Sequence, residues 1–446
     1  MTIRLILSLL VVSGSLLAQP DWRVGLASVK ITPEEPIPMA GYAARRAPFE
    51  SVDADLYAKA LALEDRGGAK ALLITADILG FPNEVAERIC ERIKASTGMA
   101  REDILLNGSH THSGPLVAGS ALIAASSDMR PRIEAYISKL EDNVVAIAER
   151  ALGEMGPASL AWGTGVAKFV MNRREFTPRG VILGANPRGI ADRSVPVLRV
   201  TSTAGDLKAV VFGAASHCTT LTGGNMLISG DYAGYAQAFL QARRPGVQAM
   251  FVTGCAGDAN PFPRGTIDLA RRHGSELAEE VVRVLGGDLL PVRGSLKTEF
   301  RRVELPLEKL SKSEIEEMAK GASSYRTFFT NAALEILNRG GKLRETYPAP
   351  LAMWQIGSEL TLVAYSGETL VDYAKNAEQV LGPLNLWVSA YNNDLFGYLP
   401  PARVLEEGGY ETRGLYADYG LFTPEVESVV MDAIEEMGRA IGRIGK

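Results

Sequence analysis

Cysteine is scarce in this chain, and its scarcity excludes a disulfide-rich scaffold. The 446 residues include only three cysteines, Cys90, Cys218 and Cys255, which lie far apart. An odd number cannot all pair within one chain, and the spacing is not that of a disulfide framework. We therefore expect buried free thiols. A bridge or a metal role stays an alternative for Cys218 and Cys255, because each lies inside a motif described below.

Basic blocks, repeats and low-complexity linkers are also missing. The net charge is −5 at pH 7, and no segment is rich in lysine or arginine. Nucleic acid is therefore not an expected partner. The chain is 46% hydrophobic and 22% charged, an ordinary globular composition. With no shift in composition along it, we expect one large domain, whose oligomeric state the sequence does not indicate.

Long apolar runs are absent except at the start, MTIRLILSLLVVSGSLLAQPDW. One arginine precedes the run, and Ala18-Gln19 resembles a cleavage point, which predicts a signal peptide over residues 1–19 and a mature domain over residues 20–446. The run is short for a membrane span, so an uncleaved anchor is the weaker alternative. We expect an exported protein, periplasmic or secreted, without a transmembrane span in the mature chain.

Short apolar runs alternate with helical patterns along the rest of the chain. The predicted strands include residues 71–79, 103–109, 195–200, 208–216 and 248–254, and the predicted helices include residues 83–96, 131–152, 231–243, 267–285 and 423–442. Residues 295–305 alternate like a half-buried strand, and residues 352–368 are typical of a hairpin. The pattern predicts an α/β fold, a mixed β-sheet core flanked by helices, with substantial parallel pairing and some antiparallel strands.

Histidine is nearly as scarce as cysteine, yet it is concentrated. Of four histidines, His110 and His112 lie two residues apart in LLNGSHTHSGP, after a predicted strand. Residues i and i+2 of a strand face the same way, so both imidazoles could reach one metal ion. His217 also ends an apolar run, and α/β proteins carry functional groups at such strand ends. Packed core histidines are the alternative. His273 lies in a predicted helix, where we expect a solvated side chain.

Carboxylates at comparable positions are Asp77, Asp231, Asp258 and Glu368. Each could instead cap a helix, and this alternative applies most to Asp231 and Glu368. Two or three histidines with one or two carboxylates favour Zn²⁺ with an open water position, and hence hydrolysis. Spacing alone does not select the carboxylate.

The segments around these residues resemble the catalytic domain of the neutral/alkaline ceramidases, the zinc-dependent amidases that cleave the N-acyl bond of ceramide. Nine matches follow the family's order: VGLASVKITP…MAGYA (24–43), DLYAKALALED (55–65), LLITADILG (72–80), SHTHSGP (109–115), MNRRE (171–175), SHCTT…NMLISGDYAGYA (216–236), GCAGDANP (254–261), YSGET (365–369) and NNDLFGYLPPARVLEEGGYE (392–411). The resemblance implies Zn²⁺ bound by His110, His217, Glu368 and Tyr398. A tyrosine ligates well only where the metal depresses its pKa.

The same resemblance implies catalytic roles for five further residues. His112 would bond to the substrate or to the developing oxyanion, while Arg173 and Tyr410 would line the substrate end. Asp258 and Asn260 fall within GCAGDANP, the counterpart of the family's Gly-Asp-Val-Ser-Pro motif. A zinc-bound water would then attack the amide of a small-molecule or lipid-like substrate, and His112, Arg173 and Tyr410 would stabilise the oxyanion.

Two departures from the family pattern leave alternatives open. Asn260 stands where the family has a serine, and an amide side chain cannot act as a nucleophile. The family's C-terminal immunoglobulin-like domain has no counterpart before Lys446, so ceramide need not be the natural substrate. The alternatives are a zinc hydrolase for another amide or an ester, and a non-catalytic binding protein that retains the fold.

Overall fold

The computed structural model describes residues 21–45, 47–118, 129–320, 324–416 and 420–445, so the predicted signal peptide lies outside the described residues. Within them, the largest sheet has nine strands, in the order β12-β10-β9-β6-β1-β3-β4-β5 with β14 paired to β6. These strands are β1 (Trp22–Lys30), β3 (Tyr57–Asp65), β4 (Lys70–Ala76), β5 (Ile104–Gly108), β6 (Gly156–Val166), β9 (Ser194–Ser202), β10 (Leu207–Ala214), β12 (Gln248–Thr253) and β14 (Leu290–Val292).

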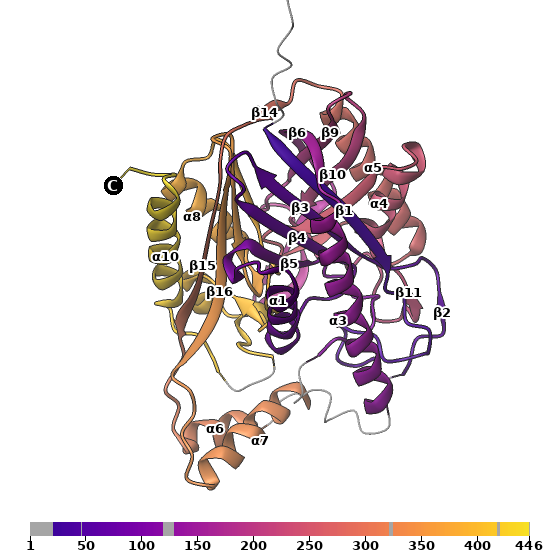
Figure 1. The fold of residues 1–446 in the computed structure, drawn as a ribbon. Coiled ribbons are helices and arrows are strands. Elements are labelled where there is room, and N and C mark those ends of the chain that lie inside the picture. The colour runs from indigo at the N-terminus through magenta and orange to yellow at the C-terminus, as the bar shows by residue number, and fades with distance from the viewer. Residues whose placement is uncertain (1–20, 46, 119–128, 321–323, 417–419, 446) are drawn as a thin grey trace, which may run out of the picture.

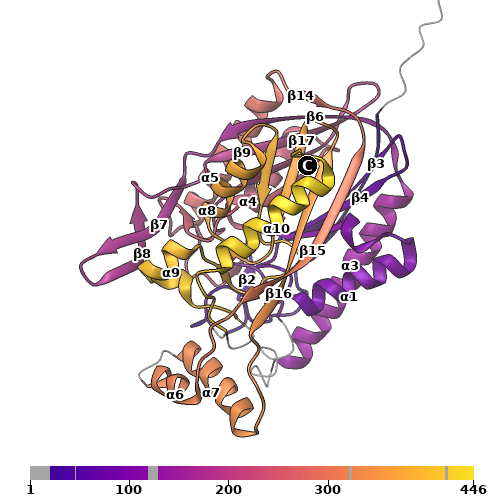
Figure 2. The ribbon, with the colours of Figure 1, turned by 90° about the vertical axis from the view of Figure 1, so that its left-hand side faces the viewer.

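A second sheet packs face to face against the first (Figures 1 and 2). Its strands, in spatial order, are β15 (Leu296–Pro306), β16 (Thr346–Ile356), β17 (Leu360–Tyr365) and β19 (Leu386–Ser389). Large apolar side chains of both inner faces form one buried cluster, to which Leu61 and Trp162 come from the first sheet and Trp354 and Trp387 from the second. Burial of this surface holds the two sheets together.

Helices cover the outer faces, so the layers are helix, sheet, sheet and helix (Figure 1). The large sheet is covered by α1 (Asn83–Thr97), α3 (Arg130–Gly153), α4 (Asp231–Arg243) and α5 (Ile267–Leu285). The second sheet is covered by α8 (Val371–Leu381) and α10 (Val426–Ile441). The predicted α/β fold with a mixed sheet flanked by helices is therefore confirmed.

Side-chain alternation explains how one strand serves two layers. In β3, Ala58, Ala60 and Ala62 belong to the cluster under α3, whereas Leu61 and Leu63 face the second sheet. Successive strand residues point to opposite faces, and the small alanines let the helix approach closely. In α3 the buried residues recur at the matching helical spacing, with Ile133, Ile137, Leu140 and Val144 forming the inward stripe.

Strand pairing is mostly antiparallel, which corrects the expectation of substantial parallel pairing. Among the described strands of the two large sheets, parallel pairs are β4–β5, β10–β12 and β17–β19. The apolar runs are as continuous as in parallel sheets because both faces of the large sheet are covered. Three smaller sheets complete the pairing: β2 (Ser51–Val52) with β11 (Leu227–Ile228), β13 (Ala259–Pro261) with β7 (Val170–Thr177) and β8 (Gly180–Asn186), and β18 (Glu368–Thr369) with β20 (Tyr398–Leu399).

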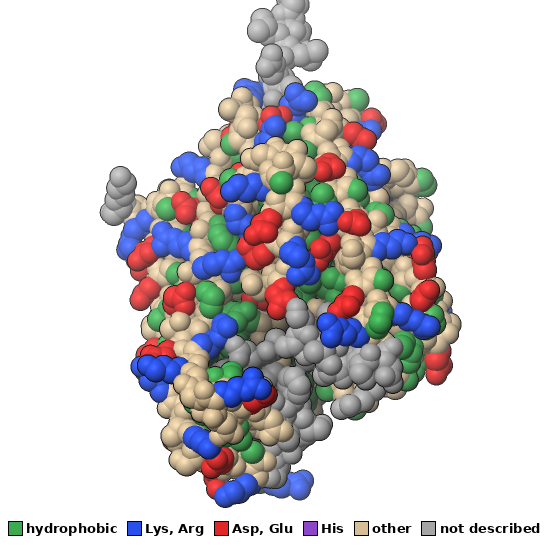
Figure 3. Space-filling view, turned by 60° about the horizontal axis from the view of Figure 1, so that its bottom comes forward, with side chains coloured by type: hydrophobic (Ala, Val, Ile, Leu, Met, Phe, Trp, Pro, Cys, Tyr) green, Lys and Arg blue, Asp and Glu red, His purple; other side chains and the backbone are tan. Residues whose placement is uncertain are grey.

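Helices α6 (Lys312–Ala319) and α7 (Ser324–Asn338) extend from the body between β15 and β16 (Figure 1). On the face seen from this end, basic and acidic side chains alternate over the described part of the surface, and no histidine is visible (Figure 3). No helix among the described residues combines the length and the apolar character needed to cross a bilayer.

The prediction of buried free cysteines is confirmed, and the prediction of a solvated His273 is wrong. All three cysteines are buried and unpaired. His273 is only 2% exposed, with Nε2 at 2.7 Å from the carbonyl oxygen of Pro263 and its ring stacked on Phe169. It lies on the inward stripe of α5, between the buried Ala270 and Leu277, so it is a packed residue and not a solvated one.

Candidate active site

Segments that follow the parallel strand pairs meet at one edge of the two sheets. Thr111, after β5, bridges Cys218, after β10, and Asn107 of β5 bridges Asn392, after β19. Parallel strands end at the same edge, so loops from both sheets converge there. The convergence brings together the histidine segments, the segment around Glu368 and the tyrosine-rich segment, which the sequence places up to several hundred residues apart.

His110 is held in a backbone conformation that is unusual for a side-chain-bearing residue, with φ 60°. Such left-handed residues are strained and gather at functional sites. Its N–H donates to the carbonyl oxygen of Ile78 over 3.0 Å, and its ring Nδ1 lies 2.8 Å from that of Leu79. A carbonyl oxygen only accepts, so Nδ1 carries the proton and Nε2 presents a lone pair.

His217 is oriented in the same way. Its Nδ1 lies 2.7 Å from the carbonyl oxygen of Ala256 and 3.1 Å from that of Ala259. Nη1 of Arg173 donates to Nε2 over 2.9 Å. Burial, assisted by the nearby Arg173 charge, lowers the pKa of His217 to about 3. The ring is therefore neutral, and its Nε2 also presents a lone pair to the site.

Glu368 brings a carboxylate to these two nitrogens. Its Oε2 lies 2.9 Å from Nε2 of His217 and 3.3 Å from Nε2 of His110. This oxygen is buried and accepts no hydrogen bond, while Oε1 accepts from the hydroxyl of Tyr416. Two imidazole nitrogens and a carboxylate oxygen thus converge, with the guanidinium of Arg173 as the cation beside them. The donor set therefore fits a bound metal ion.

His112 completes a buried cluster with the other two histidines. One ligand atom from each ring lies within 4.8 Å of the others, and Nε2 of His112 is 3.1 Å from Nε2 of His110. Unlike the other two rings, its Nδ1 has no hydrogen-bond partner. Metal-binding histidines usually donate the second ring nitrogen to a carbonyl or carboxylate. Distance alone does not separate the roles, but this contrast favours His110 and His217 as ligands.

Tyr398 lies beside Glu368 because β18 and β20 pair in parallel, with these two residues opposite each other. Its hydroxyl oxygen accepts from Nη2 of Arg173 over 2.8 Å. Burial raises the pKa of Tyr398 well above its ordinary value, although the Arg173 charge acts in the opposite direction. Tyr410 stands next to it, with ring centroids 5.6 Å apart.

Arg173 is fixed by a carboxylate that sequence reasoning did not single out. Its Nε donates to Glu411 over 3.0 Å, and Nη1 of Arg174 donates to the other oxygen over 2.6 Å. All three side chains are buried. This network ties β7 to the tyrosine-rich segment and aims both terminal nitrogens of Arg173 at the cluster. Only the neighbouring position of Glu411 and Tyr410 in GGYE could have suggested it.

Asn260 lies within the cluster, as the sequence predicts. It is 8% exposed, and its Oδ1 accepts from the hydroxyl of Thr219 over 3.0 Å and from Nη1 of Arg173 over 3.4 Å. The side chain acts there as a hydrogen-bond acceptor that orients the guanidinium.

The carboxylate of Asp258, which the resemblance implies is catalytic, is bound by neighbouring segments. One carboxylate oxygen accepts from Nδ2 of Asn172 over 3.0 Å, and the other from the N–H of Val371 at the start of α8 over 3.1 Å. Burial raises its pKa to about 7. It fixes β13, which carries Asn260, against β7 and α8.

Two other candidate carboxylates are also structural. Asp77 accepts from the N–H of Tyr57 and from Gln237. Asp231 accepts from the N–H of Leu221 and, as the first residue of α4, from the following amide. Their side chains hold loops and helices in place near the site, so of the four candidates only Glu368 meets the histidines.

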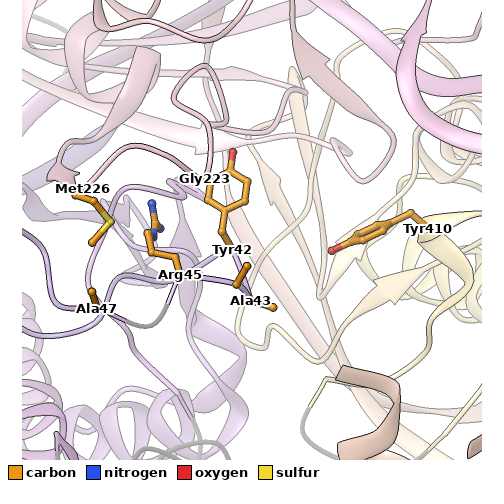
Figure 4. Close-up of a pocket in the computed structure, with 9 residues that line it drawn as sticks. Tyr42, Ala43, Arg45, Ala47, Gly223, Met226 and Tyr410 are labelled. Carbon is orange, nitrogen blue, oxygen red and sulfur yellow. The ribbon is translucent and has the colours of Figure 1, made fainter. Parts of the chain in front are cut away.

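A pocket of about 630 Å³ opens beside the cluster (Figure 4). It is lined by Gly41, Tyr42, Ala43, Ala44, Arg45, Ala47, Gly223, Met226 and Tyr410. Gly41 abuts His112 so closely that a Cβ there would lie 2.4 Å from the imidazole. The ring of Tyr42 lies 4.9 Å from the His112 ring. The pocket therefore adjoins the histidine cluster at His112. Sequence reasoning did not single out Tyr42 or Arg45, although both lie in or next to the matched MAGYA segment.

A family model for the N-terminal part of neutral/alkaline non-lysosomal ceramidase matches residues 22–266, more than half of the 446 residues. Neutral ceramidase of Pseudomonas aeruginosa is 26% identical over an alignment of 322 residues, covering 67% of this chain and 48% of that protein. Neutral ceramidase B of Dictyostelium discoideum is 26% identical over 227 residues, covering 47% of this chain and 31% of that protein. The chain spans about half or less of the length of these relatives.

Solved structures share the fold over most of the chain. A structure described as ceramidase complexed with C2 has a TM-score of 0.74 at 20% identity, covering 95% of this chain and 75% of that one. The crystal structure of neutral ceramidase from Pseudomonas aeruginosa has a TM-score of 0.72 at 22% identity, covering 95% and 74%. At these identities the likeness shows the fold alone.

Proposed function

The chain belongs to the neutral/alkaline non-lysosomal ceramidase family, and we propose that it is an exported zinc-dependent hydrolase that cleaves the amide bond of an N-acylated lipid or lipid-like substrate. The observation that carries the proposal is the meeting of two imidazole lone pairs with an oxygen of Glu368 that accepts no hydrogen bond. Imidazole nitrogens with a carboxylate oxygen are the donors of catalytic zinc sites.

His110, His217, Glu368 and Tyr398 would hold the ion. Bound Zn²⁺ would supply Lewis-acid chemistry, polarising the substrate carbonyl and lowering the pKa of water. Tyr398 fits this role only with the ion present, since burial otherwise keeps its phenol protonated.

Arg173, His112 and Tyr410 would act on the substrate itself. The guanidinium of Arg173, anchored by Glu411, presents N–H donors where negative charge develops on the amide oxygen. His112 stands between the cluster and the pocket, where its ring can hydrogen-bond to the substrate. Tyr410 lines the pocket and places a phenol near the leaving amine. Asn260 positions Arg173, which is compatible with hydrolysis without a serine nucleophile.

Metal analysis and a substrate panel test this proposal. The purified protein should contain close to one equivalent of zinc by mass spectrometry. It should hydrolyse N-acyl amides faster than O-acyl esters of the same chain, lose activity in chelator and regain it with added Zn²⁺. A preference for esters would indicate that the substrate is an ester and not an amide. Bound zinc without turnover of any substrate would support a non-catalytic binding protein. A rise in activity confined to ceramide in Asn260→Ser would indicate descent from a ceramidase.

Export rests on the sequence of residues 1–19. Expression of the full chain in a bacterial host, followed by fractionation and N-terminal sequencing of the recovered protein, tests it. A mature protein beginning near Pro20 in the periplasm or medium is expected, whereas uncleaved cytosolic protein would contradict export.

A further inference from the structure

One arginine without an acidic partner among the described residues lines the pocket. Arg45 lines it and is 9% exposed. Its terminal nitrogens donate only to backbone carbonyls, those of Ala40, His112 and Asn225, and its Nε has no acceptor. No carboxylate of a described residue forms an ion pair with it. A buried guanidinium that meets only neutral acceptors retains a charge that the protein does not balance.

Two further arginines lie on the tyrosines that line this pocket. Nη2 of Arg264 donates to the hydroxyl of Tyr42 over 3.1 Å, and its Nε is buried without an acceptor. The guanidinium of Arg413 lies 3.8 Å from the ring centroid of Tyr410. Neither is in an ion pair with any carboxylate in the described part of the chain. Arg45 therefore lines the pocket, while the half-buried Arg264 and the exposed Arg413 each lie against a tyrosine of its lining.

The arginines deeper in the site have a carboxylate partner. Arg173 and Arg174 share the buried carboxylate of Glu411. The carboxylate of Glu411 thus balances Arg173 and Arg174, whereas no carboxylate of a described residue balances Arg45. The walls of the pocket include Ala43, Ala44, Ala47 and Met226, so Arg45 is its charged lining residue, and an anion supplied by a ligand would be attracted to it.

We propose that the substrate is an amide carrying an anionic group, a carboxylate or a phosphate, on its amine side, and that Arg45, Arg264 and Arg413 select it. This inference rests on the proposed amidase function. A fatty acyl chain has no anionic group of its own, so the negative charge belongs to the amine that the reaction releases. The known neutral substrate of the family's named enzymes would lack this contact.

Matched amides test the inference. Hydrolysis of N-octanoylglycine, N-octanoylphosphoethanolamine and the neutral N-octanoylethanolamine is followed by the release of octanoic acid, which all three share. Charge-assisted hydrogen bonds predict a kcat/KM about tenfold or more higher for at least one anionic amide than for the neutral one. The better anion identifies carboxylate or phosphate as the group. Equal values for all three would overturn the inference and leave the amidase function intact.

Variants and a binding measurement keep the two proposals separate. Arg45→Gln and Arg264→Gln should each reduce the anionic preference severalfold, whereas Arg244→Gln, an exposed arginine elsewhere at the end of α4, should leave it unchanged. Because Arg45 also holds backbone, Arg264→Gln carries the test if Arg45→Gln misfolds. Calorimetry with the N-octylsulfonyl derivatives of glycine, phosphoethanolamine and ethanolamine, which are not amidase substrates, measures the preference without turnover. Tighter binding of either anionic derivative supports selection of the anion even if no amide is hydrolysed, and equal binding of all three contradicts it.

Discussion

Nη1 of Arg173 donates to Nε2 of His217 across 2.9 Å, although β7 and the segment after β10 place the two residues 44 positions apart. A guanidinium only donates, so this contact fixes Nε2 of His217 as an acceptor, the state that a metal ligand needs. The same arginine reaches Tyr398. One side chain thus orients two of the four proposed ligands.

The proposed roles of the histidines predict different effects for substitutions of His217 and His112. His217→Gln removes a ligand and should lower both zinc content and kcat/KM, the latter by about 10³-fold or more. His112→Gln should retain zinc and lose about 10²–10³-fold in kcat, since one donor to the reacting group is removed. Zinc analysis and steady-state kinetics on the same preparations provide the check. Loss of zinc in His112→Gln would assign His112 to the ligand set.

Arg173 and Arg174 form a matched pair, because both bind Glu411 but only Arg173 faces the cluster. Removing either leaves a buried carboxylate incompletely paired, at a cost of about 3–5 kcal/mol in the free energy of unfolding. Only Arg173→Gln should also reduce kcat, by about 10²-fold or more, in the fraction that is folded. Urea unfolding and kinetics measure the two effects. Equal kcat losses would show that Arg173 acts through the fold alone.

Substitution of Gly41 is predicted to lower activity because this residue faces His112. Its φ is +93°, and a Cβ would lie 2.4 Å from the ring. Gly41→Ala should displace the imidazole and lower kcat/KM at least tenfold. Gly68→Ala is the control, since φ there is +87° with nothing within 4 Å of the added Cβ. It shares the backbone strain without the clash, so it should lose stability but not activity. Normal kinetics in Gly41→Ala would contradict a precise requirement for His112.

Lys59 gives the protein a measurable pH dependence of stability. It is 3% exposed and donates to Gln237, Gln241 and the carbonyl oxygen of Ala249. Burial lowers its pKa from 10.5 to about 8, although Asp77 acts in the opposite direction. Between pH 8 and 10.5 the unfolded chain holds a proton that the folded protein has lost, so this group makes stability rise with pH in that window.

The measurement compares wild type with Lys59→Met by urea unfolding. Below pH 8 the buried charge disfavours folding, and the penalty is relieved as pH rises. Wild type should gain about 1–2 kcal/mol relative to the variant between pH 7.5 and 9.5. A constant difference between the two proteins over this range would show that Lys59 titrates alike in both states.

Local sequence indicated the fold class and the three histidines that the structure brings together. Alternation and helical spacing indicated most elements correctly, because burial of a strand face or helix stripe leaves its period in the sequence. His110, His112 and His217 could be singled out because each directly follows an apolar run. The mature boundary at residue 20 and the single-domain organisation stay predictions.

The tertiary structure distinguished residues that have the same local sequence pattern. Asp258 follows β12 and Glu368 follows β17 along the chain, yet one carboxylate fixes a helix while the other meets two histidines. His273 looked solvated until the packing of α5 showed that its position is inward. Glu411 and the unpaired Arg45 emerged only from contacts between segments remote in the chain. Sequence specifies which groups stand at strand ends, but pairing, tautomer and charge compensation depend on neighbours that only the folded chain brings within reach.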